Sequence, residues 1–212
     1  MTAQDQLELV VRAIAQTAVD NEAYFCDLDS VVGDGDFGFS LARGFEKVLE
    51  GWDDLDRTDA ATFLKKIGLV ITSRSGGTSG PLWGTAFMRA GVAAGAGELD
   101  GDRVVAMLRS AGEGIKARGK SDVGDKTLLD ALVPLTDRVA QELDAGADAG
   151  TVLAGAAQTA RAAAEATSDM IAKRGRASYT GERSKGSVDA GAMAVAVMVE
   201  RVHQSWPTQG AL

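Results

Sequence analysis

The sequence is short of two residues on which many enzymes and secreted proteins depend. Cys26 is the only cysteine, so no disulfide can form within the chain, and a reducing compartment, the cytoplasm, is expected. His203 is the only histidine, and it lies far in sequence from every glycine-rich stretch. A mechanism that needs a catalytic histidine, such as a serine-histidine-aspartate triad, is therefore not expected.

Long apolar runs and an excess of positive charge are also missing. No stretch reaches the roughly 18 apolar residues of a membrane span, and the N-terminus lacks a basic segment followed by an apolar one. The formal net charge is −8 at pH 7. Because nucleic acids and anionic membranes attract basic surfaces, neither is expected as a partner. Any phosphate would have to be bound by local groups.

Proline is scarce as well, with three residues, whereas alanine is abundant, and this composition favours helices. Hydrophobic residues make up 45% of the chain and charged residues 25%, and no linker or internal repeat divides it. We expect one all-α domain, residues 1–212, in which eight amphipathic helices pack antiparallel as a bundle. Apolar residues recur at helical spacing over residues 2–24, 41–49, 58–71, 81–92, 104–115, 128–143, 149–171 and 193–202.

Four carboxylates fall within ten residues, in the loop expected between the first two helices. Three of them, Asp29, Asp34 and Asp36, are interspersed with glycines and small residues. Crowded carboxylates repel one another, so a shared divalent cation with oxygen ligands is one explanation. Aspartate and glycine are also ordinary turn residues, so a solvated acidic turn is the other. The spacing is not that of an EF-hand, and the Asp-Phe-Gly triplet lacks the other protein-kinase motifs.

A second glycine-rich stretch, residues 73–81, reads Ser-Arg-Ser-Gly-Gly-Thr-Ser-Gly-Pro. Pro81 favours the first turn of a helix, where free backbone N–H groups, together with Thr78 and Ser79, can bind an anion. The stretch therefore predicts a phosphate cradle, with a flexible linker as the alternative. It is not a Walker A loop, because the lysine and the spacing of that motif are absent.

Two more polar loops precede later helices. One is residues 118–127, in which Thr127 is a candidate helix cap, and the other is residues 173–186, the only basic cluster in an acidic chain. The basic cluster could neutralise transferring phosphates, dock an acidic partner or be a solvated loop. Loops that precede every second helix of an up-and-down bundle lie at the same end. The four loops are therefore expected to converge on one ligand.

Taken together, these loops resemble the nucleotide-binding L subunit (ADP-binding subunit) of the dihydroxyacetone kinase family. The matching motifs follow the family's order over almost the whole chain, and their joint occurrence is highly specific. They are Leu28-Asp29-Ser30 with Gly33-Asp34-Gly35-Asp36, residues 76–85 (Gly-Gly-Thr-Ser-Gly-Pro-Leu-Trp-Gly-Thr), Gly124-Asp125-Lys126-Thr127 with Asp130, and residues 173–184 with Gly175-Arg176-Ala177-Ser178-Tyr179.

The resemblance implies a barrel of eight antiparallel helices that holds ADP or ATP and two Mg²⁺ ions at one end. It implies a kinase subunit in which Asp29, Asp34 and Asp36 bind the metal ions. Arg176 would neutralise charge in the transition state of phosphoryl transfer. The residues that would bind the nucleotide are Phe37, Gly38, Phe39, Ser40, Gly77, Thr78, Ser79, Gly119, Thr127, Leu128, Arg176, Asp189 and Gly191.

The chain departs from the family pattern at three positions. Where many relatives read Gly-Asp-His-Gly followed by Asn, this chain has Phe37 and Ser40, and the Asp-Pro-Gly of the last loop is Asp189-Ala190-Gly191. Phe37 cannot donate the hydrogen bond that an imidazole could. We therefore expect the metal site to be retained while the contacts to phosphate or nucleotide differ.

The resemblance also implies partners. In the family a separate K-type subunit or domain binds the sugar, dihydroxyacetone or another small ketose or aldose, through a histidine. This chain has no suitable histidine, so a K-type partner is expected, with either ATP or an M-type phosphotransferase-system protein as phosphoryl donor. Two rival functions stay open. One is a non-catalytic ADP-Mg-binding module that regulates a partner protein, and the other is a helical interaction protein whose acidic loop is a solvated turn.

Overall fold

A computed structural model describes residues 1–77 and 79–207, and within these ranges it contains helices and no strand, as predicted. Three short 3₁₀ segments, η1 (Trp52–Asp54), η2 (Thr167–Asp169) and η3 (Arg176–Ser184), lie between the α-helices. The α-helices are α1 (Ala3–Asp20), α2 (Glu22–Ser30), α3 (Phe37–Glu50), α4 (Ala60–Arg74), α5 (Ser79–Ala94), α6 (Gly101–Gly119), α7 (Leu129–Asp144), α8 (Ala149–Ala166) and α9 (Ala190–Ser205).

The helix expected over residues 2–24 is in fact two helices. Its start is as predicted, because Thr2 and Asp5 form a capping box that satisfies two free N–H groups of α1. At Asn21 the side-chain amide donates to the carbonyl oxygen of Thr17 at 2.9 Å, and the backbone leaves the helical conformation. The expected count of eight helices is therefore not confirmed, since the described residues hold a ninth, α2.

Other helix ends follow from local chemistry. Asp59 caps α4 by accepting the N–H of Thr62 at 2.7 Å. α5 begins at Ser79, so Pro81 lies in the first turn, where its missing N–H has no helical partner to lose. α8 ends at Ala166 instead of near residue 171, because η2 turns the chain there.

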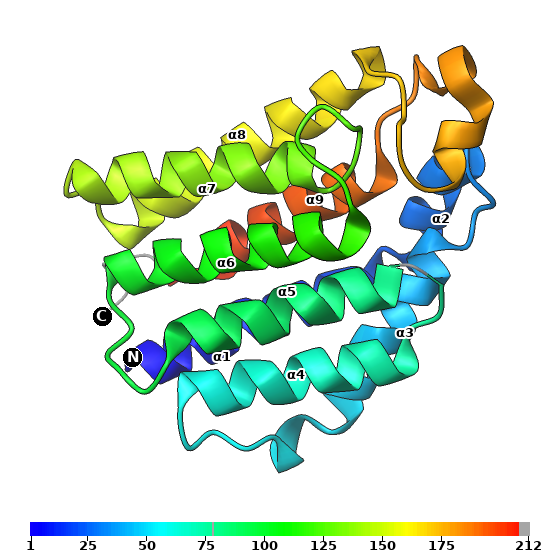
Figure 1. Ribbon diagram of the computed structural model, residues 1–212. Helices are drawn as coiled ribbons and strands as arrows, with labels where there is room; N and C mark the ends of the chain where they lie inside the picture. The colour runs from blue at the N-terminus through cyan, green and yellow to red at the C-terminus, as the bar shows by residue number, and fades with distance from the viewer. Residues whose placement is uncertain (78, 208–212) are drawn as a thin grey trace.

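Eight of the helices form a closed ring. In order, α1, α3, α4, α5, α6, α7, α8 and α9 each pack against the next, and α9 packs back against α1 (Figure 1). The apolar faces point inward and bury side chains such as Phe45, Ile67 and Leu129 completely. The interior keeps a cavity of about 460 Å³, lined mostly by apolar side chains of α1 and of α4 to α9. None of the helices in the described ranges has the length and apolar character needed to cross a bilayer.

Glycines bring α4 and α5 unusually close together. A Cβ atom built on Gly84 of α5 would lie 2.0 Å from the Thr72 hydroxyl oxygen and 2.7 Å from the Gly68 carbonyl oxygen of α4. These separations are far below van der Waals contact, so only glycine fits at this crossing. The close contact fixes the start of α5, and with it the glycine-rich loop that precedes that helix.

We expect Gly84→Ala to destabilise the protein by roughly 1–3 kcal/mol, because the new methyl group would push α4 and α5 apart. The measurement is urea unfolding followed by circular dichroism. The control is Gly112→Ala in α6, where a Cβ atom would meet nothing within 4 Å. That control should be neutral or up to about 1 kcal/mol more stable, because alanine is the better helix former. Equal stability of the two variants would contradict the close crossing.

Candidate functional site

The loops before α3, α5, α7 and α9 lie at the same end of the ring, where the topology predicts them (Figure 1). Contacts between distant segments join these loops. Arg176, from the segment before α9, forms an ion pair with Asp34, from the loop before α3. A Cβ atom on Gly191, in α9, would lie 3.3 Å from the Cβ atom of Leu128, which precedes α7. These contacts make one polar surface from segments far apart in the sequence.

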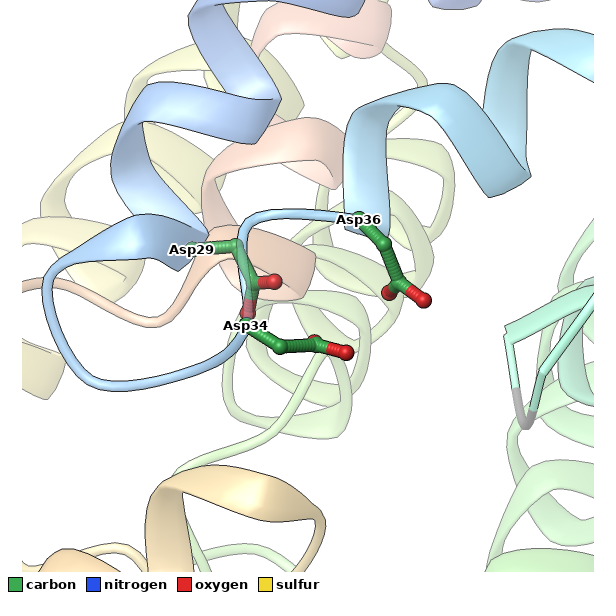
Figure 2. Close-up of side chains that lie close together, drawn as sticks. All are labelled: Asp29, Asp34 and Asp36. Atoms are coloured by element: carbon green, nitrogen blue, oxygen red, sulfur yellow. The ribbon is translucent and has the colours of Figure 1, made fainter.

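The acidic cluster consists of Asp29, Asp34 and Asp36. One carboxylate oxygen from each lies within 4.8 Å of the other two. Asp29 lies in the last turn of α2, not in the loop as expected, whereas Asp34 and Asp36 lie on the loop that leads into α3 (Figure 2). Asp29 ends up half-buried and accepts the N–H groups of Gly35 at 2.9 Å and Phe37 at 3.4 Å. Asp34 and Asp36 are exposed. Hard oxygen donors at this spacing, with one carboxylate fixed by the backbone, fit a divalent cation.

Arg176 is the cation that faces this cluster in the structure. Its guanidinium forms an ion pair with Asp34, and one of its nitrogens lies 3.9 Å from a carboxylate oxygen of Asp36. The neighbouring basic side chains have a different partner, since Lys173 and Arg174 each lie 3.4 Å from the carboxylate of Asp125. The basic segment is therefore an ordered structure that presents Arg176 to the three aspartates.

The first turn of α3 faces the cluster mainly with its backbone. A Cβ atom on Gly38 would lie 2.0 Å from the Glu22 carbonyl oxygen, so glycine lets α3 pack directly on α2. The sulfur of Cys26 accepts the N–H of Phe39 at 3.2 Å, which satisfies one of the free donors at the start of the helix. This contact gives the single cysteine a capping role that its sequence position did not suggest.

Among the residues expected to bind nucleotide, Phe37 and Phe39 differ in where their rings lie. The ring of Phe37 packs against Phe25, with ring centroids 6.2 Å apart, and belongs to the core. Only its backbone faces the acidic loop. The ring of Phe39 is about half exposed, and the guanidinium of Arg43 lies 5.0 Å from its centroid.

The glycine-rich loop before α5 lies beside the start of α3. Gly77 has φ +63°, and nothing lies within 4 Å of a Cβ atom built there, so its backbone is open to a ligand. The hydroxyl of Ser40 would lie 3.9 Å from a Cβ atom on Gly76. Ser79 opens α5. Thr78, which was also expected to bind phosphate, lies outside the described residues.

Gly119 ends α6 at the same end of the ring. A Cβ atom there would lie 3.3 Å from a methyl group of Leu82 in the first turn of α5. The absence of a side chain at Gly119 therefore brings the end of α6 next to the glycine-rich loop, where the resemblance predicted nucleotide contacts.

Asp130 holds the loop before α7. Its carboxylate accepts the N–H groups of Gly124 at 2.5 Å and of Thr127 at 2.7 Å. Thr127 was a candidate cap for α7, and its hydroxyl accepts the N–H of Leu129, the first residue of that helix, at 3.3 Å, although Leu128 occupies the N-cap position itself. This role of Asp130 was not predicted, although its three-residue spacing from Thr127 was a signal for such a contact.

Asp189 caps α9 by accepting the N–H of Ala192 at 2.7 Å, and its own N–H donates to the Thr167 hydroxyl at 2.8 Å. Burial raises the pKa of Asp189 to about 7, and the negative charges of Asp130 and Asp29 act in the same direction. The positive charge of Lys126 opposes that shift. The site therefore contains a carboxyl group that titrates near neutral pH.

The fold and the site define a helical barrel with a carboxylate cluster and glycine-rich loops at one end. Comparison with known proteins gives the particular family. A family model described as "DAK2 domain" matches residues 31–204. The chain therefore belongs to the DAK2 domain family.

Relatives in this family are named as kinases or kinase subunits. The chain is 39% identical to the "PEP-dependent dihydroxyacetone kinase, ADP-binding subunit DhaL" of Escherichia coli (strain K12), over 84% of this chain and 85% of that protein. It is 37% identical to the "L-erythrulose 1-kinase" of Mycolicibacterium smegmatis, over 90% of this chain but 34% of that protein. The domain thus occurs both as a separate subunit and within longer kinases.

Solved structures agree with the fold. The dihydroxyacetone kinase of C. freundii, solved in complex with AMP-PNP and Mg²⁺, is similar to 94% of this chain with a TM-score of 0.73 and 26% sequence identity. The native form of the same kinase gives a TM-score of 0.75. This chain corresponds to 34% of the length of those kinase chains.

We expect Arg176→Ala to tighten divalent-cation binding in nucleotide-free protein, because a metal ion would no longer compete with the guanidinium for Asp34 and Asp36. An exposed ion pair predicts a change of roughly two- to fivefold in the dissociation constant. The measurement is calorimetric titration with Mg²⁺. The matched control is Arg174→Ala, whose guanidinium faces Asp125 instead. Weaker or unchanged metal binding by Arg176→Ala would contradict the competition.

We also expect a pH dependence that Asp189→Asn removes. Asparagine retains a side-chain oxygen that can cap α9 but cannot ionise. Because the folded pKa of Asp189 is raised from 3.8 to about 7, the folded state holds this proton more tightly than the unfolded state. Wild-type stability should therefore fall relative to Asp189→Asn as the pH rises from about 4 to 7, by on the order of 1 kcal/mol per pH unit. Urea unfolding of both metal-free proteins at several pH values in this range measures the difference in stability. If the free energies of unfolding of the two proteins change with pH in parallel, the raised pKa of Asp189 is disproved.

Proposed function

We propose that this chain is the nucleotide-binding, phosphoryl-transferring subunit of a kinase that acts on a small ketose or triose such as dihydroxyacetone. One observation carries the proposal: three carboxylates and a guanidinium meet at the end of the barrel where the glycine-rich loops converge. Its relatives support it, since one is named an ADP-binding subunit and a similar structure holds AMP-PNP and Mg²⁺. Residues 1–212 would act as one domain.

Asp29, Asp34 and Asp36 would hold two Mg²⁺ ions. Bound magnesium would neutralise negative charge on the phosphate oxygens of the nucleotide. Three carboxylates cannot fill two octahedral coordination shells, so phosphate oxygens and water would complete them. Asp29 is suited to bridge protein and ion, because its bonds to Gly35 and Phe37 fix its orientation while lone pairs remain available.

Two helix starts would supply the phosphate contacts. The first turns of α3, from Phe37, and of α5, from Ser79, lie at the positive end of the helix dipole. In the structure the N–H groups of Phe37, Phe39 and Ser40 donate to Asp29, Cys26 and Asp36, so a phosphate would have to replace these acceptors to use those donors. Gly77 would let its backbone approach the phosphates, together with the Thr78 hydroxyl. The residues that would contact the rest of the nucleotide are Gly119, Thr127, Leu128, Asp189 and Gly191.

Arg176 would be the catalytic residue. In the structure its guanidinium pairs with Asp34 and lies near Asp36. If these carboxylates held magnesium instead, the guanidinium would be available to the transferring phosphoryl group. That group spreads negative charge over its oxygens in a loose transition state, which a planar cation stabilises.

The sugar would come from a K-type partner subunit, because this chain has no suitable histidine to bind it. Within the L-erythrulose 1-kinase the matching region is one third of a longer protein, which supports separate nucleotide and sugar parts. The phosphoryl donor would be ATP, or an M-type protein of the phosphotransferase system that recharges bound ADP. Relatives named "PEP-dependent" and "PTS-dependent" support the second route. Location in the cytoplasm stays a prediction.

The test is isothermal titration of ADP and ATP into nucleotide-free protein, with and without Mg²⁺. We expect magnesium-dependent binding that Asp34→Asn/Asp36→Asn weakens by two orders of magnitude or more, at about 1.4 kcal/mol for each tenfold change. The matched control is Asp53→Asn/Asp54→Asn, which changes two adjacent exposed aspartates of η1 outside the cluster. No binding by the wild type under either condition would overturn the proposal.

Transfer is then measured with a K-type partner by mass spectrometry of the sugar phosphate. Arg176→Ala should keep nucleotide binding within about tenfold but lower kcat by roughly 10³-fold, as expected for a cation that acts on the transition state. Magnesium-dependent binding without transfer by the wild type would instead favour a non-catalytic ADP-binding regulatory module.

A further inference from the structure

Lys126, in the loop before α7, is an unusual residue for its position. Its side chain is almost fully buried, with 3% of the residue exposed, and its backbone is left-handed with φ +62°. Both features are costly, since burial penalises an ammonium ion and the left-handed conformation is unfavourable for residues other than glycine. Burial also lowers its pKa, although the negative charge of Asp189 opposes this shift. Stability alone does not explain a lysine at this position.

The ammonium of Lys126 donates to three backbone carbonyls. These belong to Met170 at 3.2 Å, to Ser187 at 2.8 Å and to Ser184. An ammonium ion has three donors, so the described contacts use them all. The three bonds diverge from one nitrogen atom, which suits lysine better than the planar fork of arginine.

All three carbonyls lie in the segment between α8 and α9. Met170 follows η2, Ser184 ends η3, and Ser187 lies two residues before Asp189. One side chain therefore fixes both ends of the segment that carries Arg176, and also the entry to α9. A parallel set of contacts supports the same connection, since the N–H of Lys173 donates to the Asp125 carbonyl at 3.0 Å and its ammonium to that of Gly124 at 2.9 Å.

We propose that Lys126 is a positioning residue for phosphoryl transfer, whose bonds to Met170, Ser184 and Ser187 hold Arg176 over the acidic cluster. The inference rests on the proposed function. Arg176 itself is exposed, and η3 contains the non-helical Gly181, so the local chain alone would not fix the guanidinium. Fixing it in advance matters because a displacement of about 1 Å can cost 10²-fold in rate.

The first test compares Lys126→Met with Lys120→Met by hydrogen exchange of backbone amides, measured by mass spectrometry. Methionine keeps the length of the side chain but has no donors. Lys120 is the matched control, because it also has a left-handed backbone, with φ +50°, but an exposed side chain. We expect exchange over residues 170–188 to become roughly tenfold faster or more in Lys126→Met, because three buried carbonyls lose their donor. Lys120→Met should match the wild type. Unchanged exchange in a folded Lys126→Met would overturn the proposal.

The second test asks whether Lys126 acts through Arg176. In nucleotide-free protein, Lys126→Met should tighten Mg²⁺ binding roughly two- to fivefold, as Arg176→Ala does, because the guanidinium leaves the aspartates. In the Arg176→Ala background the same change should have no further effect. A lysine with a merely structural role would leave metal binding unchanged or alter it equally in both backgrounds.

Turnover with a K-type partner is measured for the same double-mutant cycle of Lys126→Met and Arg176→Ala. Lys126→Met should lower kcat about 10²-fold in the wild-type background but at most about threefold further in Arg176→Ala. Equal losses in both backgrounds would overturn positioning while leaving the proposed function intact. A wild-type chain that transfers no phosphoryl group, yet shows the expected metal-binding cycle, would instead refute the function and leave the contact between Lys126 and the Arg176 segment established.

If Lys126→Met fails to fold, the wild type provides a separate test. Lysine acetylation read out by mass spectrometry should modify Lys120 readily under native conditions and Lys126 at least tenfold more slowly, because the bonded ammonium must first be released. Equal reactivity of the two lysines would overturn the buried contact on which the proposal depends.

Discussion

Repulsion among three carboxylates within 4.8 Å of one another is the interaction around which the polar end of the barrel is arranged. Negative charges this close destabilise the folded state unless positive charge lies beside them. In the structure Arg176 supplies that charge. Arg176 in turn depends on the segment between α8 and α9, whose carbonyls at Met170 and Ser187 accept hydrogen bonds from Lys126. The acidic loop and the basic segment therefore form one electrostatic unit, although more than 100 residues separate them.

A second common feature is that aspartates next to the loops before α3, α7 and α9 accept backbone N–H groups there. Asp29 accepts N–H groups of the loop before α3, Asp130 accepts those of the loop before α7, and Asp189 caps α9. Backbone donors in a loop lack the partners that a helix provides, and a carboxylate can accept several at once. Burial is the main reason that the pKa of Asp189 is raised to about 7, and the nearby charges of Asp130 and Asp29 add to the shift. The carboxylates that order the loops therefore also affect one another's protonation.

The ring of helices could be predicted largely from the sequence, because apolar spacing and aspartate caps such as Asp59 are local signals. The break at Asn21 could not, since the apolar pattern continues across it. The residues of the acidic cluster were predicted from motifs, but the inward ring of Phe37 depends on Phe25 and was not. The roles of Lys126 rest on contacts 44 to 61 residues away in sequence, for which no local pattern exists. Prediction therefore failed where partners are distant, not where the chemistry is unusual.

Exposure of the site has a consequence for the proposed reaction. The side chains of Arg176 and Asp36 are 62% and 52% exposed, so water has access to the groups that would hold the transferring phosphoryl group. Transfer to a sugar instead of to water requires that water be excluded when the group moves. At this end of the ring the described chain continues in loops and in η3, which begins at Arg176 (Figure 1). Under the proposed function, the surface that excludes water would belong to the sugar-binding partner. In that case docking would both deliver the acceptor and protect the phosphoryl group, so that neither subunit could catalyse the reaction efficiently alone.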